Sequence, residues 1–356
     1  MTSVVWDFHA MDTWFFRNGT PFNLGNNVGD GDMMFPPSMS TVQGAIRTAI
    51  ARGQGWSPQH PERWPSLLGS ADSLGALSLK GPYLLRGDDY LFPLPRHLLR
   101  VSDTWVRLRP GPFVETDIGV RRLPVVENRV NGVQTVDNAW ITSAGLSRVL
   151  RGDVPRSDDV VLAADLWKAE PHTGLTINPS TGAATPSLLY HTVHTRVVST
   201  THLAVTVEGI PSEWQAHSLL IPFGGEGRYA YVTTRSSTVP IPTLPEVKPD
   251  HSSNEYRVWV LLLTAGSFDD VSKVMQEGPL PWPCLSAVTG RVHMQGGWDL
   301  QRQRPRPLKP FIPSGSVWFY QLTPSQWEQV QGWHGQQVGL DQEYGYGQFV
   351  FGLWEE

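Results

Sequence analysis

The clearest pattern of apolar and polar positions lies near the end of the chain. Residues 323–330 read as the start of a helix, because Pro324 and Ser325 stand where a first turn and a cap belong. Further on, Gly345 and Gly347 lead into an alternating aromatic and aliphatic run. Such glycines allow a positive φ and the close approach of another backbone segment, and the alternation is typical of a strand. The predicted order is therefore helix, glycine loop, strand.

The same order occurs once more in the middle of the chain. Pro211 and Ser212 open a second predicted helix, and the apolar run at 219–221 continues its apolar side. A glycine loop at 224–228 follows, and then the alternating run 229–232. A weak internal repeat of this kind predicts two related units in tandem.

The first unit is predicted to open with a strand and a helix. An alternating run at 4–9 indicates the strand. We expect Ser40 to cap the helix, with Gln43 completing a capping box and Gly53 at its end. The apolar positions of this helix form one stripe: Val42, Ala45, Ile46, Ala49 and Ile50.

Short strands are expected at 77–79 and 90–92, and the alternating segments 188–193 and 203–207 are expected to pair. Residues of about 93–186 have a looser pattern with one helix at about 142–150, and we interpret them as a large insertion. The first unit then has the order strand, helix, strand, strand, helix, strand, which is the ferredoxin-like arrangement.

The second unit repeats this order. Strands are predicted at 256–263, 285–292, 316–322 and from 344, and helices at 269–276 and from 325. The predicted fold class is α+β, with two tandem ferredoxin-like (RRM-like) βαββαβ domains and a large insertion in the first. The predicted ranges are 1–235 for the first domain, 236–254 for a Pro- and Ser-rich linker and 255–356 for the second domain.

Composition narrows the class of protein. The 356 residues suffice for two cores, and 40% hydrophobic with 17% charged residues indicates a folded chain. The single cysteine, Cys284, excludes an internal disulfide and fits a reducing compartment. The first residues lack a secretion signal, and no apolar run approaches the roughly 20 residues of a membrane helix. We therefore expect a cytoplasmic protein without membrane contact.

The charge pattern bears on nucleic-acid binding in two ways. A formal net charge of −5 argues against binding over the whole surface. However, only five of the 28 basic residues are Lys, and Arg is the better residue for gripping phosphate or stacking on a base. A GC-rich genome that favours Arg codons would explain the same bias.

Two segments could contact a phosphate backbone. The loop Gly224–Arg228 combines exposed backbone N–H groups with a cation, although a tight turn is the structural alternative. The segment from Arg291 to Lys309 holds an Arg-x-Arg-Pro-Arg-Pro sequence, which is expected to be an exposed loop or simply a solvated charged surface. Arg47 lies off the apolar stripe of its helix, and Arg17 lies beside an Asn-Gly turn, so both could face a ligand.

Sequence patterns that would indicate catalysis are weak. The sequence lacks the HExxH, P-loop and GxSxG motifs. His9 and His172 are the most suggestive of the eleven histidines, but a lone His is more often a structural residue. His191 and His194 lie three apart on a predicted strand and so point to opposite faces, which excludes a shared metal. We therefore expect neither a metal nor a cofactor.

Several short motifs together resemble the third subunit of the Cmr complex, a member of the RAMP superfamily of type III-B CRISPR proteins. The matching segments, in order, are Phe15–Phe22, Phe35–Ser38, Gly44–Arg47, His172–Leu175, Gly224–Arg228, Val288–Gly290, Pro313–Val317 and Gly345–Gly347. They span nearly the whole chain.

The resemblance implies a non-catalytic RNA-binding subunit of an RNA-guided interference complex. It would help to hold the 5′ tag of the crRNA next to the large cyclase-like subunit, contact the backbone RAMP subunits and meet target RNA only indirectly. The alternatives are a metal-independent RAMP endoribonuclease that processes guide precursors and a scaffold that binds only proteins. The predicted RNA-binding residues are Arg17, Asn18, Arg47, His172, Gly224, Gly225, Arg228, Arg291, Arg302, Arg304, Arg306 and Lys309.

Overall fold

The computed structural model describes residues 3–18, 33–117, 119–127, 130–214, 218–299 and 302–355. The chain forms two compact units, and each is assembled from three segments of the sequence. Unit 1 comprises Met1–Gly87, Ala164–Thr238 and Met294–Lys309, and unit 2 comprises Asp88–Ala163, Val239–His293 and Pro310–Glu356.

Unit 1 is built on antiparallel strands in the order β13-β14-β1-β12-β2. Their bounds are β1 Val4–Ala10, β2 Ser78–Arg86, β12 Thr201–Glu208, β13 Ser218–Pro222 and β14 Tyr229–Arg235. Helix α1 (Met39–Gly53) packs against β2 and β13. Because side chains alternate across a strand, Trp6, Phe8 and Val232 share the buried face of this sheet.

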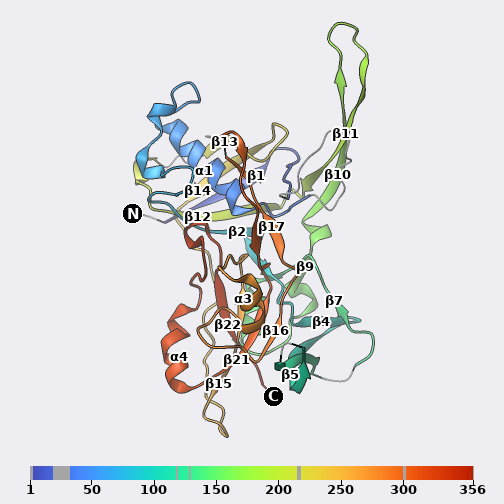
Figure 1. Cartoon of the computed structure of the whole chain (residues 1–356), viewed down its shortest axis with the longest axis vertical. Coiled ribbons are helices and arrows are strands. Elements are labelled where there is room, and N and C mark those ends of the chain that lie inside the picture. Colours follow the sequence, from blue (N-terminus) through green and yellow to red (C-terminus); the bar gives the residue numbers. More distant parts are fainter. Residues whose placement is uncertain are drawn as a thin grey trace. The chain divides into compact units, whose positions relative to one another are not determined.

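A long two-stranded ribbon, β10 (Trp167–Ile177) and β11 (Ala184–Val197), also belongs to unit 1 (Figure 1). The remaining regular elements of the unit are short: the 3₁₀ turns Pro61–Arg63, Ser66–Leu68 and Ser212–Trp214 and the hairpin strands β18 (Trp298–Asp299) and β19 (Arg304–Pro305). Three further short elements cross the sequence boundaries of the units: the 3₁₀ turn Ala163–Asp165 and strands β17 (His293–Gln295) and β20 (Lys309–Phe311).

Unit 2 contains the predicted order of strand, helix, strand, strand, helix, strand. The elements are β15 Tyr256–Leu262, α3 Val271–Glu277, β16 Ser286–Val288, β21 Val317–Leu322, α4 Pro324–Val330 and β22 Phe349–Leu353. The four strands form an antiparallel sheet in the order β16-β21-β15-β22. Its core includes the buried side chains of Trp318, Phe349 and Phe351.

The other elements of unit 2 come from the predicted insertion and its edges. Strands β3 (Asp89–Pro93), β8 (Ala139–Thr142) and β9 (Val160–Leu162) pair in that order, and α2 (Ser143–Leu150) follows β8 as predicted. A second sheet has the order β6-β5-β4-β7, formed by Gly119–Val126, Thr104–Thr116, Leu98–Val101 and Gln134–Thr135. Three 3₁₀ turns complete the unit: Ser157–Asp159, Gln331–Trp333 and Gln342–Tyr344.

The α+β class with mostly antiparallel sheets is confirmed, while the tandem ferredoxin-like arrangement and the domain ranges stay predictions. The change from unit 1 to unit 2 after Thr238 falls inside the predicted linker, which has no helix or strand. The units differ from the predicted ranges in two places, since residues 88–163 belong to unit 2 and residues 294–309 to unit 1.

Several local predictions are wrong. Within the range of the expected helix over 211–221, the described residues form the 3₁₀ turn Ser212–Trp214 and the start of β13, where Ile221 is buried and Leu220 is exposed, so the apolar run has the period of a strand. The segment 188–193 pairs with β10, and 203–207 pairs with β1 and β2. Helix α1 begins after Ser38, and the amide of Gln43 donates to the Ser40 carbonyl, so Ser40 is not its cap.

The last strand begins at Phe349, later than predicted. The residues before it form a glycine loop whose main chain packs tightly against that of Val338. Gly347 has φ +75°, and a Cβ there would lie 1.9 Å from the carbonyl oxygen of Val338. The role predicted for this glycine from the sequence, a close approach between backbone segments, is confirmed.

A buried histidine in unit 2 gives an expected pH dependence. His97 lies against the rings of Trp259 and Phe319, and burial lowers its pKa to about 3, with Arg107 contributing in the same direction. The unfolded chain therefore takes up a proton near pH 6.5 that the folded chain refuses until about pH 3, so stability falls as pH falls through this window. We expect urea unfolding of His97→Leu to lose less stability between pH 7 and pH 4 than the wild type. An unchanged pH slope would contradict this.

Candidate nucleic-acid interface

A cluster of charged side chains lies where the β10–β11 ribbon meets the end of β1, and it contains two of the predicted RNA-binding residues. We call it the ribbon-base cluster, and its members are Asp12, Thr13, Glu170, His172, His194, Arg196 and Arg228. Arg196 donates from Nη1 to Asp12 Oδ1 at 2.8 Å and from Nη2 to Glu170 Oε1 at 2.8 Å. Arg228 donates from Nη1 to the other oxygen of Asp12, Oδ2, at 2.8 Å. One carboxylate thus holds two guanidinium groups side by side.

The two histidines of the cluster are stacked. The ring centroids of His172 and His194 lie 4.0 Å apart, with 15° between the ring planes. His172 Nε2 lies 2.9 Å from Glu170 Oε1, and His194 Nδ1 lies 3.0 Å from the hydroxyl oxygen of Thr13. The stack therefore joins the ribbon to the segment after β1.

The alternation of the hairpin explains why these residues meet. In the ribbon, Lys168 pairs with Arg196, Glu170 with His194 and His172 with Thr192, so these side chains share one face. The main chain of Trp14 exchanges two hydrogen bonds with Thr195, at 2.9 and 2.7 Å, which fixes Asp12 and Thr13 beside that face. The register also confirms that His191 and His194 point to opposite faces.

The electrostatics of the cluster set its protonation at neutral pH. The hydrogen bond from Arg196, aided by His172, lowers the pKa of Glu170 to about 2, so this carboxylate is charged. Burial, together with the neighbouring His172 and Arg228, lowers the pKa of His194 to about 4, so this ring is neutral. The two carboxylates balance the two guanidinium groups, and Arg196 keeps a half-exposed side chain that a phosphate could approach.

The glycine loop at 224–228 serves mainly to position Arg228. Gly224 has φ +86°, and a Cβ there would lie 2.6 Å from the carbonyl oxygen of Phe15. The Gly225 amide donates to that same oxygen at 2.9 Å. The tight-turn alternative therefore describes Gly224 and Gly225, because the amide of Gly225 is already used within the protein.

Three other predicted residues converge on one turn of unit 1, residues 70–73. Arg47 is only 6% exposed and donates from Nη2 to the carbonyl oxygens of Ser70, at 2.6 Å, and Ser73, at 3.2 Å. Arg306 donates to the carbonyl oxygen of Ala71. Arg302 forms ion pairs with Asp72 and Asp299, at 2.7 and 2.9 Å. The expectation that Arg47 could face RNA is wrong, because its side chain is buried and the turn supplies carbonyl oxygens that hold it.

The remaining predicted residues lie outside both groups. Arg291, Arg304 and Lys309 are exposed, whereas Arg17 and Asn18 are half-buried and Arg17 forms a main-chain bridge with Met33. Their RNA contacts stay predictions. Sequence reasoning missed Asp12, Glu170, Arg196 and the role of His194. The signal was present in the alternating charged and polar residues at 168–172 and 192–196, which a hairpin brings to one face.

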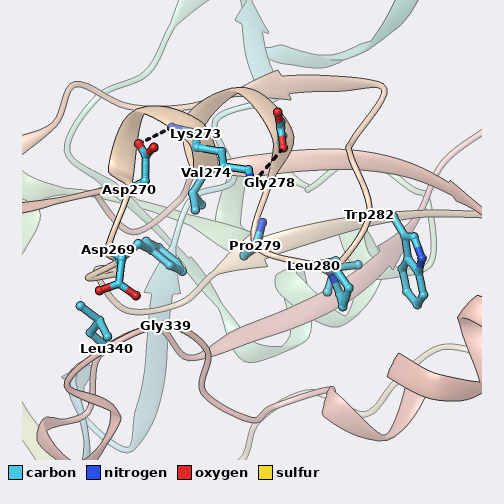
Figure 2. Close-up of a pocket in the computed structure, with 13 residues that line it drawn as sticks. Asp269, Asp270, Lys273, Val274, Gly278, Pro279, Leu280, Trp282, Gly339 and Leu340 are labelled. Atoms are coloured by element: carbon cyan, nitrogen blue, oxygen red, sulfur yellow. Dashed lines mark hydrogen bonds and ion pairs between the residues drawn. The ribbon is translucent and has the colours of Figure 1, made fainter.

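Unit 2 has a pocket of about 520 Å³ beside α3 (Figure 2). Its lining includes Trp282 and Leu280, and its charged groups are Asp269, Asp270, Glu277 and Lys273. Asp270 caps α3 through the Lys273 amide at 2.9 Å, and Lys273 lies 3.9 Å from Glu277. Three carboxylates against one ammonium make this pocket unfavourable for phosphate, so the ribbon-base cluster is the better candidate interface.

Among the residues that the structure describes, no group of three or more His, Cys, Asp or Glu side chains could hold a metal ion. Within the same residues, no helix has the length and apolar character needed to cross a membrane.

Comparisons with known proteins identify the family. A search of curated proteins finds no match. Two solved structures of chains from the type III-B Cmr-beta complex, both determined by cryo-EM, are similar in fold. One, bound to cognate target RNA and AMPPnP (state 1), has 13% identity and a TM-score of 0.53, over 93% of this chain and 88% of that chain. The other, bound to cognate target RNA, has 14% identity and a TM-score of 0.53, over 97% and 95%.

The family model described as CRISPR-associated protein (Cas_Cmr3) matches residues 6–354, which is nearly the whole chain and includes the ribbon-base cluster. This agrees with the motifs found in the sequence, and the chain therefore belongs to the Cas_Cmr3 family of CRISPR-associated proteins.

Proposed function

We propose that this chain is a non-catalytic RNA-binding subunit of a type III-B Cmr complex, and that it helps to hold the 5′ tag of the crRNA next to the large cyclase-like subunit. It would contact the backbone RAMP subunits, meet target RNA indirectly and act in the cytoplasm. The observation that carries the proposal is the pair of guanidinium groups, Arg196 and Arg228, held beside His172 by one carboxylate.

The geometry favours binding to a phosphate backbone. Guanidinium groups bind phosphate in a planar, bidentate manner, and an incoming phosphate can replace a carboxylate as their partner. Because the arginines are already oriented, little side-chain freedom is lost when RNA binds. We also infer that two ferredoxin-like units carry these contacts, an inference supported in unit 2 by the element order and by the strand order β16-β21-β15-β22.

The test is a binding measurement with tag-bearing guide RNA. The purified chain should bind it weakly, with an affinity that falls steeply as salt rises, and the assembled complex with the large subunit should bind it far more tightly. Guide RNA without the tag serves as the control, and its affinity should rise much less on assembly of the complex than that of tag-bearing RNA. Binding that ignores salt, or that is absent even in the assembled complex, would refute the proposal.

The endoribonuclease alternative is disfavoured by the state of the histidines. The side chain of His194 is buried and its ring is neutral, and His172 is engaged by Glu170 and by the stack. A general acid and base must both reach the reacting atoms. Incubation of labelled precursor RNA with the wild type, His9→Ala and His172→Ala should therefore give no cleavage in any case. Cleavage by the wild type that His172→Ala abolishes would establish the enzyme.

A further inference from the structure

A row of ring-bearing and apolar side chains crosses four neighbouring strands of unit 1. Leu220 on β13 pairs with Tyr231 on β14, and Tyr231 pairs with His9 on β1. On β12, the next strand, the ring of His202 stacks on His9 with centroids 4.6 Å apart. The rings of His9 and Tyr231 lie 6.5 Å apart. These residues share one face, because side chains directly opposite in an antiparallel pair point the same way.

This face is the outward one along β13 and β14. The buried residues of β14, Ala230 and Val232, occupy its inner face, whereas Tyr229 and Tyr231 are 45% and 42% exposed. Leu220, opposite Tyr231, is 60% exposed. Exposed apolar side chains that gather on one surface indicate a binding site rather than a contribution to the core.

Cations lie at both ends of β14. Arg228 of the ribbon-base cluster immediately precedes Tyr229 in the sequence, and Arg235, which alternation places on the same face as Tyr229 and Tyr231, donates to Asp7 Oδ2 at 2.6 Å. Burial lowers the pKa of His9, with Asp7 acting in the opposite direction, so its ring is neutral at neutral pH. The surface thus combines flat neutral rings with guanidinium groups at its edge, which is the combination that single-stranded nucleic acids bind through their bases and phosphates.

We propose that Tyr229, Tyr231 and His9, with Leu220 beside them, form a stacking platform for unpaired bases of RNA. The inference rests on the proposed function, since it assigns to this surface the bases of the same RNA whose phosphates contact the ribbon-base cluster. The adjoining guanidinium groups favour RNA over an apolar protein surface as the occupant, because a purely apolar protein contact gains nothing from a charged border.

The test compares the Tyr229→Leu/Tyr231→Leu variant with Tyr229→Phe/Tyr231→Phe in the assembled complex. The probe is tag-bearing guide RNA in which single nucleotides are replaced, one at a time, by abasic sites. The leucine variant should bind intact RNA about tenfold more weakly, and the phenylalanine variant should bind like the wild type, because a phenyl ring still stacks. Phe113→Leu, which removes an exposed ring of unit 2, is the matched control and should have no effect.

The abasic series identifies the stacked bases. In the wild type, one or two abasic positions should weaken binding by about tenfold. In the leucine variant the same positions should have no further effect, because the ring that they contact is gone. The dependence of affinity on salt should be the same in both proteins, since no phosphate contact has been removed.

Four results would overturn the platform. Abasic positions that weaken the leucine variant as much as the wild type would show that the bases stack elsewhere. A leucine variant that binds RNA normally but no longer co-purifies with another subunit would identify the surface as a protein contact. If both tyrosine variants bind like the wild type while Arg196→Ala/Arg228→Ala loses RNA, the platform fails and the proposed function stands. Absence of salt-dependent binding by the wild type would refute both.

Discussion

Replacing Arg196 and Arg228 together with alanine is expected to weaken binding of tag-bearing guide RNA by about 10- to 100-fold and to lower the salt dependence by about two counterions. The reason is electrostatic. The two substitutions remove both cations and leave Asp12 and Glu170, whose ion pairs with them are described above, as uncompensated negative charges. A neutral cluster would become a repulsive one. The measurement is affinity in the assembled complex at several salt concentrations.

The controls separate charge from folding. Arg196→Lys/Arg228→Lys keeps the charge and should recover most of the salt dependence, although not the planar geometry. Arg100→Ala breaks an exposed ion pair with Asp103 in unit 2 and should change nothing. Arg306→Ala tests the turn at residues 70–73 and should affect RNA less than the double variant does. Full RNA retention by the double variant would favour a scaffold that binds only proteins.

A large loss of stability is expected from Gly347→Ala. Its φ of +75° is strained for any L-residue, and the added Cβ would lie 1.9 Å from the carbonyl oxygen of Val338, which is backbone and cannot rotate away. The Gly347 amide also donates to Ala265 at 2.8 Å, so two segments must move together. We expect a loss of about 3 kcal/mol in the free energy of unfolding, measured by urea denaturation.

Gly332→Ala is the matched control for this prediction. Gly332 lies in the 3₁₀ turn Gln331–Trp333, and a Cβ there would meet nothing within 4 Å. Its substitution should change the free energy of unfolding by less than about 0.5 kcal/mol. Equal stabilities of the two variants would show that the main chain around Val338 can move to accommodate the added Cβ at little cost in free energy.

The parts of the fold that could be predicted from the sequence are those where local chemistry and pattern agree. Helix α4 begins close to its predicted position with Pro324 in its first turn, although Thr323 and not Ser325 is its cap; the Thr323 hydroxyl and the Gln326 side chain form a capping box. The predicted helix over 211–221 had a similar Pro-Ser start at 211–212, but this start forms only a 3₁₀ turn, and the three consecutive apolar residues at 219–221 could belong to a helix or to a strand. Tertiary pairing with β14 decided it.

The candidate site was predictable only in part, because most of its contacts join residues that are far apart in the sequence. His172 and Arg228 were identified by the motifs around them, and the structure brings them into one cluster. Their partners Asp12 and Arg196 are 184 residues apart in sequence, and no local pattern links them. For Arg47, Arg302 and Arg306, the deciding partners are carbonyl oxygens and a carboxylate of one turn, and the side-chain sequence does not show where carbonyl oxygens will point.

The contacts that Arg302 and Arg306 make with residues 70–73 affect the order in which the chain can fold during its synthesis. Arg302 and its partner Asp72 are separated by 230 positions, and the segment Met294–Lys309 is the last piece of unit 1 to be made. During synthesis, most of unit 2 must therefore be translated before Arg302 and Arg306 can contact residues 70–73. Contacts of such long range slow folding, and until then the early segments stay exposed to chaperones and proteases.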